Sequence, residues 1–130
     1  MKKQKSQFQN EEEIKAYIKK NNIDATRSDS GLYYSITNQG KGTQPTRDSN
    51  ITIGYIGYLT DGTIFDKSES LEINLSVVIE GWKEGIQHFK EGGEGILIIP
   101  AHLGYGNTDY GSIPGGSVLV FDLELQEVIS

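Results

Sequence analysis

The stretch Val78-Ile79-Glu80-Gly81-Trp82-Lys83-Glu84-Gly85-Ile86 decides how the rest of this 130-residue chain is interpreted. It contains the only tryptophan, which follows closely on an apolar Val-Val-Ile run. Ile86 and Phe89 follow Trp82 at i+4 and i+7, the spacing of one face of a helix. The pattern predicts a short helix with a buried face. Taken alone, such a tryptophan is a core anchor, because large aromatic side chains dominate core burial.

Length and composition describe one domain with a short extension, since 130 residues suffice for one core and not for two ordinary domains. Eighteen acidic against twelve basic residues give a net charge of −6 without a basic stripe, so we expect no nucleic-acid partner. The absence of cysteine removes disulfides, thiolate nucleophiles and Cys-ligated zinc. His88 and His102 lack metal-binding spacing, so we expect no metal or other cofactor.

The chain contains no apolar run that approaches the ~20 residues needed to cross a bilayer, so we expect no membrane span. The start Met1-Lys-Lys-Gln-Lys-Ser has no apolar core of a signal peptide. Two locations stay open. The protein is cytoplasmic if Met1 is the natural start, and belongs to the cell envelope or periplasm if a signal segment was removed.

Residues 1–30 are expected to form an N-terminal tail, a helix and a linker, with disorder over residues 1–9. Asn10 as N-cap, with Glu13 three residues later, predicts a helix over residues 10–21. Its apolar stripe is narrow, so we expect it to pack against the main domain of a monomer. Dimerisation through this helix is the alternative.

Alternating apolar residues predict the strands of an antiparallel sheet. Asp61-Gly62 gives the strongest hairpin signal, and Lys67 to Ser70 reads as a charged connection. Gly92-Gly93 is expected to stop the Trp82 helix. Strands and one short buried helix favour an α+β domain with about five strands wrapped over the helix. The expected strand segments are residues 31–37, 50–59, 63–65, 71–75, 94–99 and 117–129.

Three further pieces of the sequence are of the kind that a small apolar pocket needs. They are Gly54-Tyr55-Ile56-Gly57-Tyr58, Asp61-Gly62-Thr63-Ile64-Phe65-Asp66, and Gly104-Tyr105-Gly106 with Ile113-Pro114 ahead of Val120-Phe121-Asp122. Together with the Trp82 helix, in this order and at these separations, they resemble the FKBP family of peptidyl-prolyl cis–trans isomerases. The resemblance implies an FKBP-type domain over residues 31–130, with a half-open sheet wrapped around the short helix.

The resemblance also implies an enzyme that accelerates X–Pro isomerisation in peptides and unfolded proteins through a dry aromatic pocket, and so assists protein folding. The implied partners are proline-containing peptides or unfolded client proteins, with macrolides such as tacrolimus or rapamycin as further ligands. The alternative is a non-catalytic FKBP-like chaperone or peptide-binding module.

The residues that match the family pattern fall into two predicted sets. In the catalytic set, Trp82 would be the platform under the prolyl ring, and the Tyr105 hydroxyl would bond a substrate carbonyl. This set is Tyr55, Phe65, Asp66, Trp82, Tyr105 and Phe121. In the substrate-binding set, Ile79 would offer its backbone N–H. This second set is Leu71, Val78, Ile79, Tyr110 and Ile113.

Two positions depart from the family pattern. Leu71 stands where many members carry phenylalanine, and Asp109-Tyr110 occupies the region where well-studied members carry a histidine. One wall of the pocket is therefore expected to be less aromatic, and Tyr110 is expected at the rim, so that rate or specificity differs from those members.

Overall fold

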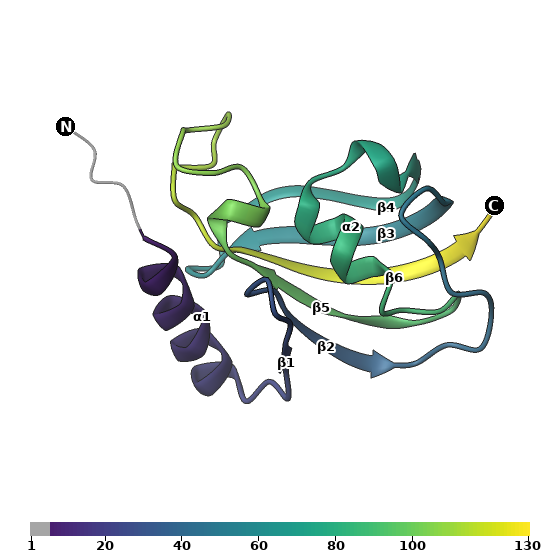
Figure 1. Ribbon diagram of the computed structural model, residues 1–130, viewed down its shortest axis with the longest axis horizontal. Coiled ribbons are helices and arrows are strands. Elements are labelled where there is room, and N and C mark those ends of the chain that lie inside the picture. The colour runs from purple at the N-terminus through teal and green to yellow at the C-terminus, as the bar shows by residue number, and fades with distance from the viewer. Residues whose placement is uncertain (1–5) are drawn as a thin grey trace.

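The structure, a computed structural model, describes residues 6–130 as one antiparallel sheet with a helix against each face (Figure 1). The sheet order is β1-β2-β5-β6-β3-β4. The expected α+β class with an antiparallel sheet and an N-terminal helix is confirmed, with six strands in place of about five. The elements are α1 (Gln7–Asn21), β1 (Thr26–Arg27), β2 (Tyr33–Asn38), β3 (Asn50–Leu59), β4 (Ile64–Asn74), α2 (Glu80–Ile86), β5 (Glu94–Ile99) and β6 (Leu119–Val128), with single 3-10 turns at Leu75–Val77 and Ala101–Leu103.

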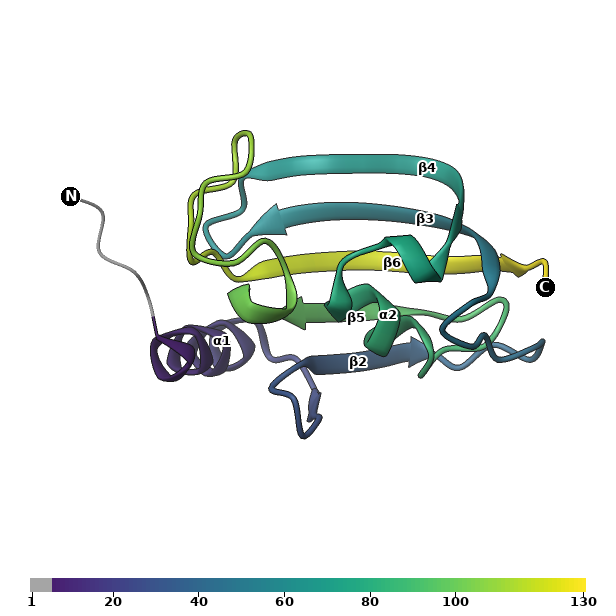
Figure 2. The ribbon, with the colours of Figure 1, turned by 45° about the horizontal axis from the view of Figure 1, so that its top comes forward.

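Strand alternation gives the sheet two buried faces at one end. On β6, Leu119 and Phe121 point to the face covered by α2, whereas Val120 between them points to the face covered by α1. Ile14 of α1 and Val120 are both fully buried. Helix α1 covers only the start of β6 on this face (Figure 2), because Asp122 and Glu124, farther along the same face, are exposed.

Helix α1 begins earlier than the capping pattern at Asn10 predicts. Ser6 is the N-cap, and its side chain and that of Gln9 form a capping box. Asn10 is therefore not a cap; it lies inside the first turns and is only 2% exposed. The expected disorder over residues 1–9 is wrong for the helical residues 7–9, and residues 1–5 lie outside the described part of the chain.

The expected linker from Asp24 to Ser30 contains strand β1, which pairs with β2. The side chain of Arg27 bonds Glu11 of α1 at 2.9 and 3.1 Å, and the Tyr33 hydroxyl donates to the same carboxylate at 3.0 Å. These charged contacts fasten α1 to the edge of the sheet. None of the helices in residues 6–130 is long and apolar enough to cross a membrane.

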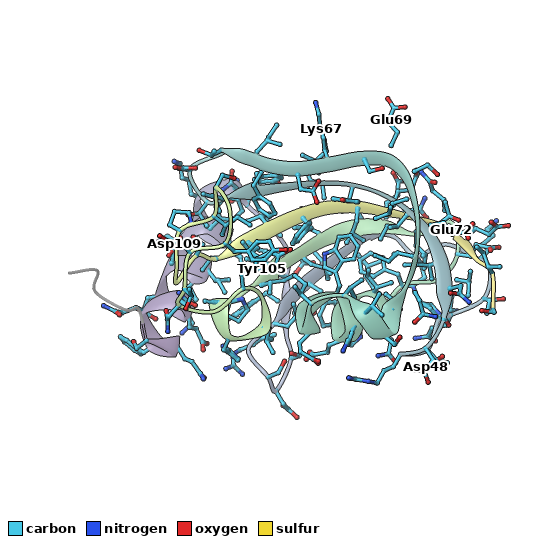
Figure 3. All side chains as sticks on the ribbon, turned by 90° about the horizontal axis from the view of Figure 1, so that it is seen from above. Asp48, Lys67, Glu69, Glu72, Tyr105 and Asp109 are labelled. Carbon is cyan, nitrogen blue, oxygen red and sulfur yellow. The ribbon has the colours of Figure 1, made fainter. Side chains whose placement is uncertain are left out.

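Strand β4 runs without a break through the segment Lys67–Ser70, which the sequence analysis took for a connection. It is the outermost strand, so one of its edges faces solvent and tolerates consecutive charged side chains. Lys67 and Glu69 project outward from this strand in Figure 3. Irregular register steps between Ile53 and Tyr55, and between Gly57 and Tyr58, keep β4 paired with β3 over its whole length.

Helix α2 lies close against β5 because glycines face the strand. A Cβ atom at Gly85 would lie 2.7 Å from both Cδ atoms of Leu97, and one at Gly81 would lie 2.6 Å from Ile99 Cγ2. The helix ends at Ile86, ahead of the expected stop at Gly92-Gly93. This close approach buries the face of α2 that carries Trp82.

We expect Gly85→Ala to destabilise the fold by about 1–3 kcal/mol through overpacking against Leu97. At an unhindered helical site the same change stabilises by roughly 0.5–1 kcal/mol. Urea unfolding of Gly85→Ala, Leu97→Ala and the double variant measures the coupling between the two sites. The loss of unfolding free energy caused by Gly85→Ala should largely vanish when Leu97 is already alanine. An unchanged loss would contradict steric contact with Leu97 as its cause.

Candidate active site

A cleft of about 330 Å³ opens on the α2 side of the sheet. Its floor comes from α2 and β6, one wall from β3 and β4, and its rim from the loop between Ala101 and Gly116 (Figure 3). It is lined by Tyr55, Asp66, Leu71, Ile73, Val77, Val78, Ile79, Trp82, Tyr105, Tyr110 and Phe121.

The centre of the cleft is built from aromatic rings that meet edge to face. The Trp82 ring lies 5.0 Å from Tyr55 at 83° and 5.2 Å from Phe121 at 78°. Phe65 meets Phe121 at 5.5 Å and 89°. Edge-to-face pairs are the geometry that aromatic quadrupoles prefer. Trp82 is only 5% exposed, so its indole is a fixed apolar floor.

Gly57 on β3 makes room for these rings. A Cβ atom at this position would lie 2.7 Å from Phe121 Cε1 and 2.8 Å from Phe65 Cζ. Because real Cβ atoms do not approach so closely, any other residue would displace both rings. Glycine here therefore serves the wall of the cleft.

Tyr55 of β3 and Asp66 of β4 form a polar contact in the wall of the cleft. The Tyr55 hydroxyl donates to Asp66 Oδ2 at 2.8 Å. Burial raises the pKa of Tyr55 to about 12, and the hydrogen bond to the Asp66 carboxylate adds to the shift. Tyr55 is therefore a neutral donor at physiological pH, and it holds the Asp66 side chain at the edge of the cleft.

Tyr105 and Tyr110 form the rim as a stacked pair. Their ring centroids lie 4.3 Å apart at 9°. Burial raises the pKa of Tyr105 above its ordinary value, so its hydroxyl keeps its proton. Among residues 6–130 this hydroxyl has no hydrogen-bond partner. It is a donor available to a bound molecule.

Two further donors of the described chain are unused. Ile79 is the N-cap of α2, and its backbone N–H donates to no group of residues 6–130. The Trp82 Nε1–H is buried and also lacks an acceptor there. Buried donors are normally satisfied, so unused ones beside a cleft need an explanation.

The cleft contains all but two of the residues that the sequence analysis selected. Phe65 stands behind Phe121, and Ile113 is a core residue whose backbone pairs with Tyr110. Ile73 and Val77 line the cleft and were missed. Ile73 could have been found, because it lies two residues after Leu71 and therefore on the same face of the strand. Val77 ends the 3-10 turn Leu75–Val77, where strand alternation no longer applies, and only its place before Val78 pointed to it.

A wider hollow of about 570 Å³ lies on the opposite face of the sheet. Its lining includes four carboxylates, from Glu69, Glu94, Asp122 and Glu124, and lacks Trp82 and Phe121. Because these carboxylates are exposed and the hollow lacks an aromatic floor, we take the aromatic cleft as the candidate site. No group of three or more His, Cys, Asp or Glu side chains in residues 6–130 could hold a metal ion.

Comparisons with known proteins agree with this geometry. The sequence model of the family described as FKBP-type peptidyl-prolyl cis-trans isomerase matches residues 41–126. A probable FKBP-type peptidyl-prolyl cis-trans isomerase FkpA of Neisseria meningitidis serogroup B is 43% identical, over 92% of this chain and 46% of that protein. This chain belongs to the FKBP-type isomerase family. It spans about half the length of the curated relatives it matches.

Two solved structures share the fold. The crystal structure of FkpA from Escherichia coli superposes with a TM-score of 0.83 at 37% identity, covering 90% of this chain and 57% of that one. A peptidyl-prolyl cis-trans isomerase from Pseudomonas syringae pv. tomato gives a TM-score of 0.81 at 25% identity, covering 98% of both chains. The FKBP-like fold expected from the sequence is confirmed.

We expect Tyr55 to make stability depend on alkaline pH. Its pKa is raised to about 12 from 10.0, so the stability that Tyr55 contributes is complete below about pH 10 and is lost as pH rises to about 12. Urea unfolding across this window should show a smaller loss for Tyr55→Phe than for the wild type. Other tyrosines titrate equally in both proteins and cancel. An equal loss of stability in the two proteins would show that the pKa of Tyr55 is the same in the folded and the unfolded state.

Proposed function

We propose that this chain is a peptidyl-prolyl cis–trans isomerase that accelerates X–Pro isomerisation in peptides and unfolded proteins and thereby assists folding. The observation that carries the proposal is the buried Trp82 floor, met edge-on by Tyr55 and Phe121, beside hydrogen-bond donors that find no partner within residues 6–130. In this proposal residues 31–130 form the isomerase domain and residues 1–30 are an N-terminal extension, of which helix α1 packs on the sheet.

The chemistry asks little of a catalyst beyond such a cleft. Amide resonance sets a barrier of roughly 18–20 kcal/mol. At the twisted transition state this resonance is lost, so the carbonyl is less polar and the nitrogen pyramidalises. A water-poor aromatic cleft stabilises that less polar form relative to the planar amide. No covalent step or proton transfer is needed.

Each group then has a defined part. The prolyl ring lies on Trp82, between Tyr55 and Phe121, while Phe65 supports Phe121 from behind. The Ile79 N–H and the Tyr105 hydroxyl bond substrate carbonyls on either side of the ring. Substrate residues around proline contact the remaining lining residues. These are Leu71, Val78 and Tyr110, with Ile113 beneath the rim.

Asp66 acts on the substrate indirectly in this proposal. Its carboxylate accepts the Tyr55 hydroxyl and lies near enough to Tyr105 to affect the pKa of that tyrosine. It therefore fixes the wall and sets the electrostatic potential at the cleft edge. Since isomerisation requires no proton transfer, Asp66 needs no change of protonation state.

We expect the wild type to accelerate isomerisation of a proline-containing peptide, and Tyr105→Phe to lower kcat/KM by about twofold to tenfold. The loss corresponds to one neutral hydrogen bond, roughly 0.5–1.5 kcal/mol. Trp82→Leu should lower kcat/KM further, because the prolyl ring of the substrate loses the indole on which it lies. A protease-coupled or NMR exchange assay measures the rates.

Tyr34→Phe is the matched control, since Tyr34 stacks on His88 at 4.0 Å and does not line the cleft. It should retain wild-type activity. All variants are first checked for folding, because removing a core tryptophan side chain costs about 3–5 kcal/mol. A folded wild type without activity would refute the proposal and favour the non-catalytic binding module.

We also propose that the cleft accepts macrolides such as tacrolimus or rapamycin. Trp82 is the only tryptophan, so its fluorescence reports on the floor alone. Titration of the folded protein should give a saturable change, absent from a free tryptophan control and weakened in Phe121→Leu. A flat titration would contradict macrolide binding while leaving the isomerase assay to decide catalysis.

A further inference from the structure

The side chain of Asn10 joins helix α1 to both ends of the rim loop. Its Oδ1 accepts the backbone N–H of Ala101 at 2.7 Å, and its Nδ2 donates to the Gly116 carbonyl at 3.0 Å. Ala101 and Gly116 are the first and last residues of the loop that carries Tyr105. Figures 1 and 2 show this loop and the start of α1 at the same end of the sheet.

The two backbone groups need this partner because the β5–β6 ladder has already ended. Its last pair is Ile99 with Leu119, after which the strands separate. Without Asn10, the Ala101 N–H and the Gly116 carbonyl would have no hydrogen-bond partner among residues 6–130, although both residues are buried. A carboxamide supplies one donor and one acceptor, as a peptide group does. The Asn10 side chain thus takes the place of the backbone partners that the two groups lack.

The same two residues are bridged from inside the loop. The Gly106 N–H donates to the Ala101 carbonyl at 2.8 Å, and the Gly116 N–H donates to the Gly106 carbonyl at 2.9 Å. Asn10, Ala101, Gly106 and Gly116 therefore form a closed ring of four hydrogen bonds, which we call the loop ring. Gly106 directly follows Tyr105, so the loop ring fixes the backbone from which Tyr105 projects.

Helix α1 does not depend on this contact for its attachment. Ile14 is fully buried against the sheet, and Glu11 bonds Arg27 and Tyr33. Both hydrogen bonds that the Asn10 side chain makes within residues 6–130 go to the loop, so their loss affects the loop more than the attachment of α1. Removing its amide would free the base of the loop while α1 stays in place.

We propose that Asn10 is a positioning residue of the isomerase site, acting through the loop ring on Tyr105. This inference rests on the proposed function, because its effect on catalysis presupposes an active cleft. With the loop ring open, the Tyr105 hydroxyl spends less time where it bonds the substrate carbonyl. Trp82, Tyr55 and Phe121 are untouched, so the apolar part of the site remains.

The test uses Asn10→Leu, which has similar volume and no hydrogen-bonding group. We expect kcat/KM to fall about threefold to tenfold, as for the loss of one neutral hydrogen bond. Asn10→Asp keeps the acceptor for Ala101 and loses the donor to Gly116, so it serves if the leucine variant does not fold. Glu11→Ala is the matched control, since it loosens the same helix without touching the loop, and should stay within about twofold of the wild type.

Two readouts separate positioning from a merely structural role. Hydrogen exchange of the Gly106 and Gly116 amides should accelerate in Asn10→Leu and not in Glu11→Ala. In a double-mutant cycle with Tyr105→Phe, the Asn10→Leu loss should be small once the hydroxyl is absent. Size-exclusion runs confirm that all variants elute as the wild type does.

Several results would overturn the inference. These are unchanged exchange in the loop, unchanged kcat/KM despite faster exchange, an equal loss in Glu11→Ala, or full additivity with Tyr105→Phe. An inactive wild type would refute the proposed isomerase function and with it the catalytic role of Asn10. In that case the exchange experiment still decides whether the amide orders the loop, so the two failures are distinguishable.

Discussion

The close approach of helix α2 to strand β5 is the constraint on which the rest of the structure depends. Gly81 and Gly85 leave no side chains between the helix and Ile99 and Leu97, so the helix lies directly on the sheet. Only at this distance can Trp82 be nearly buried and still meet rings from β3 and β6. The sheet curves around the helix, and the cleft is the space left along one side of it.

The chemistry of the cleft follows from what this packing leaves unsatisfied. Rings in edge-to-face contact exclude water, and the few polar groups either bond each other, as Tyr55 and Asp66 do, or remain available, as the Tyr105 hydroxyl does. A site of this kind binds through apolar area and orients through a few donors. That is sufficient for a reaction whose transition state is less polar than its ground state.

The sequence predicted the elements whose signals are local. Alternation located β3 and β6, and the spacing after Trp82 located α2, because burial imposes those periods directly. The start of α1 was missed because residues 1–9 were taken for a disordered tail, although Ser6-x-x-Gln9 matches the capping box. The role of Asn10 could not be predicted, because its side chain bonds Ala101 and Gly116, which are far from it in sequence. Strand β4 was cut short because edge strands relax the usual alternation.

The position of β4 at the sheet edge has a mechanical consequence for the cleft. The floor of the cleft belongs to α2 and to β6, a central strand paired on both sides. The wall that carries Asp66, Leu71 and Ile73 is β4, which is paired on one side only. Local opening free energies are lower where neighbours are fewer. The site therefore joins a stiff floor to a compliant wall. In the proposed isomerase, the wall would bend to fit side chains of different size before proline, while the platform under the prolyl ring would keep its position.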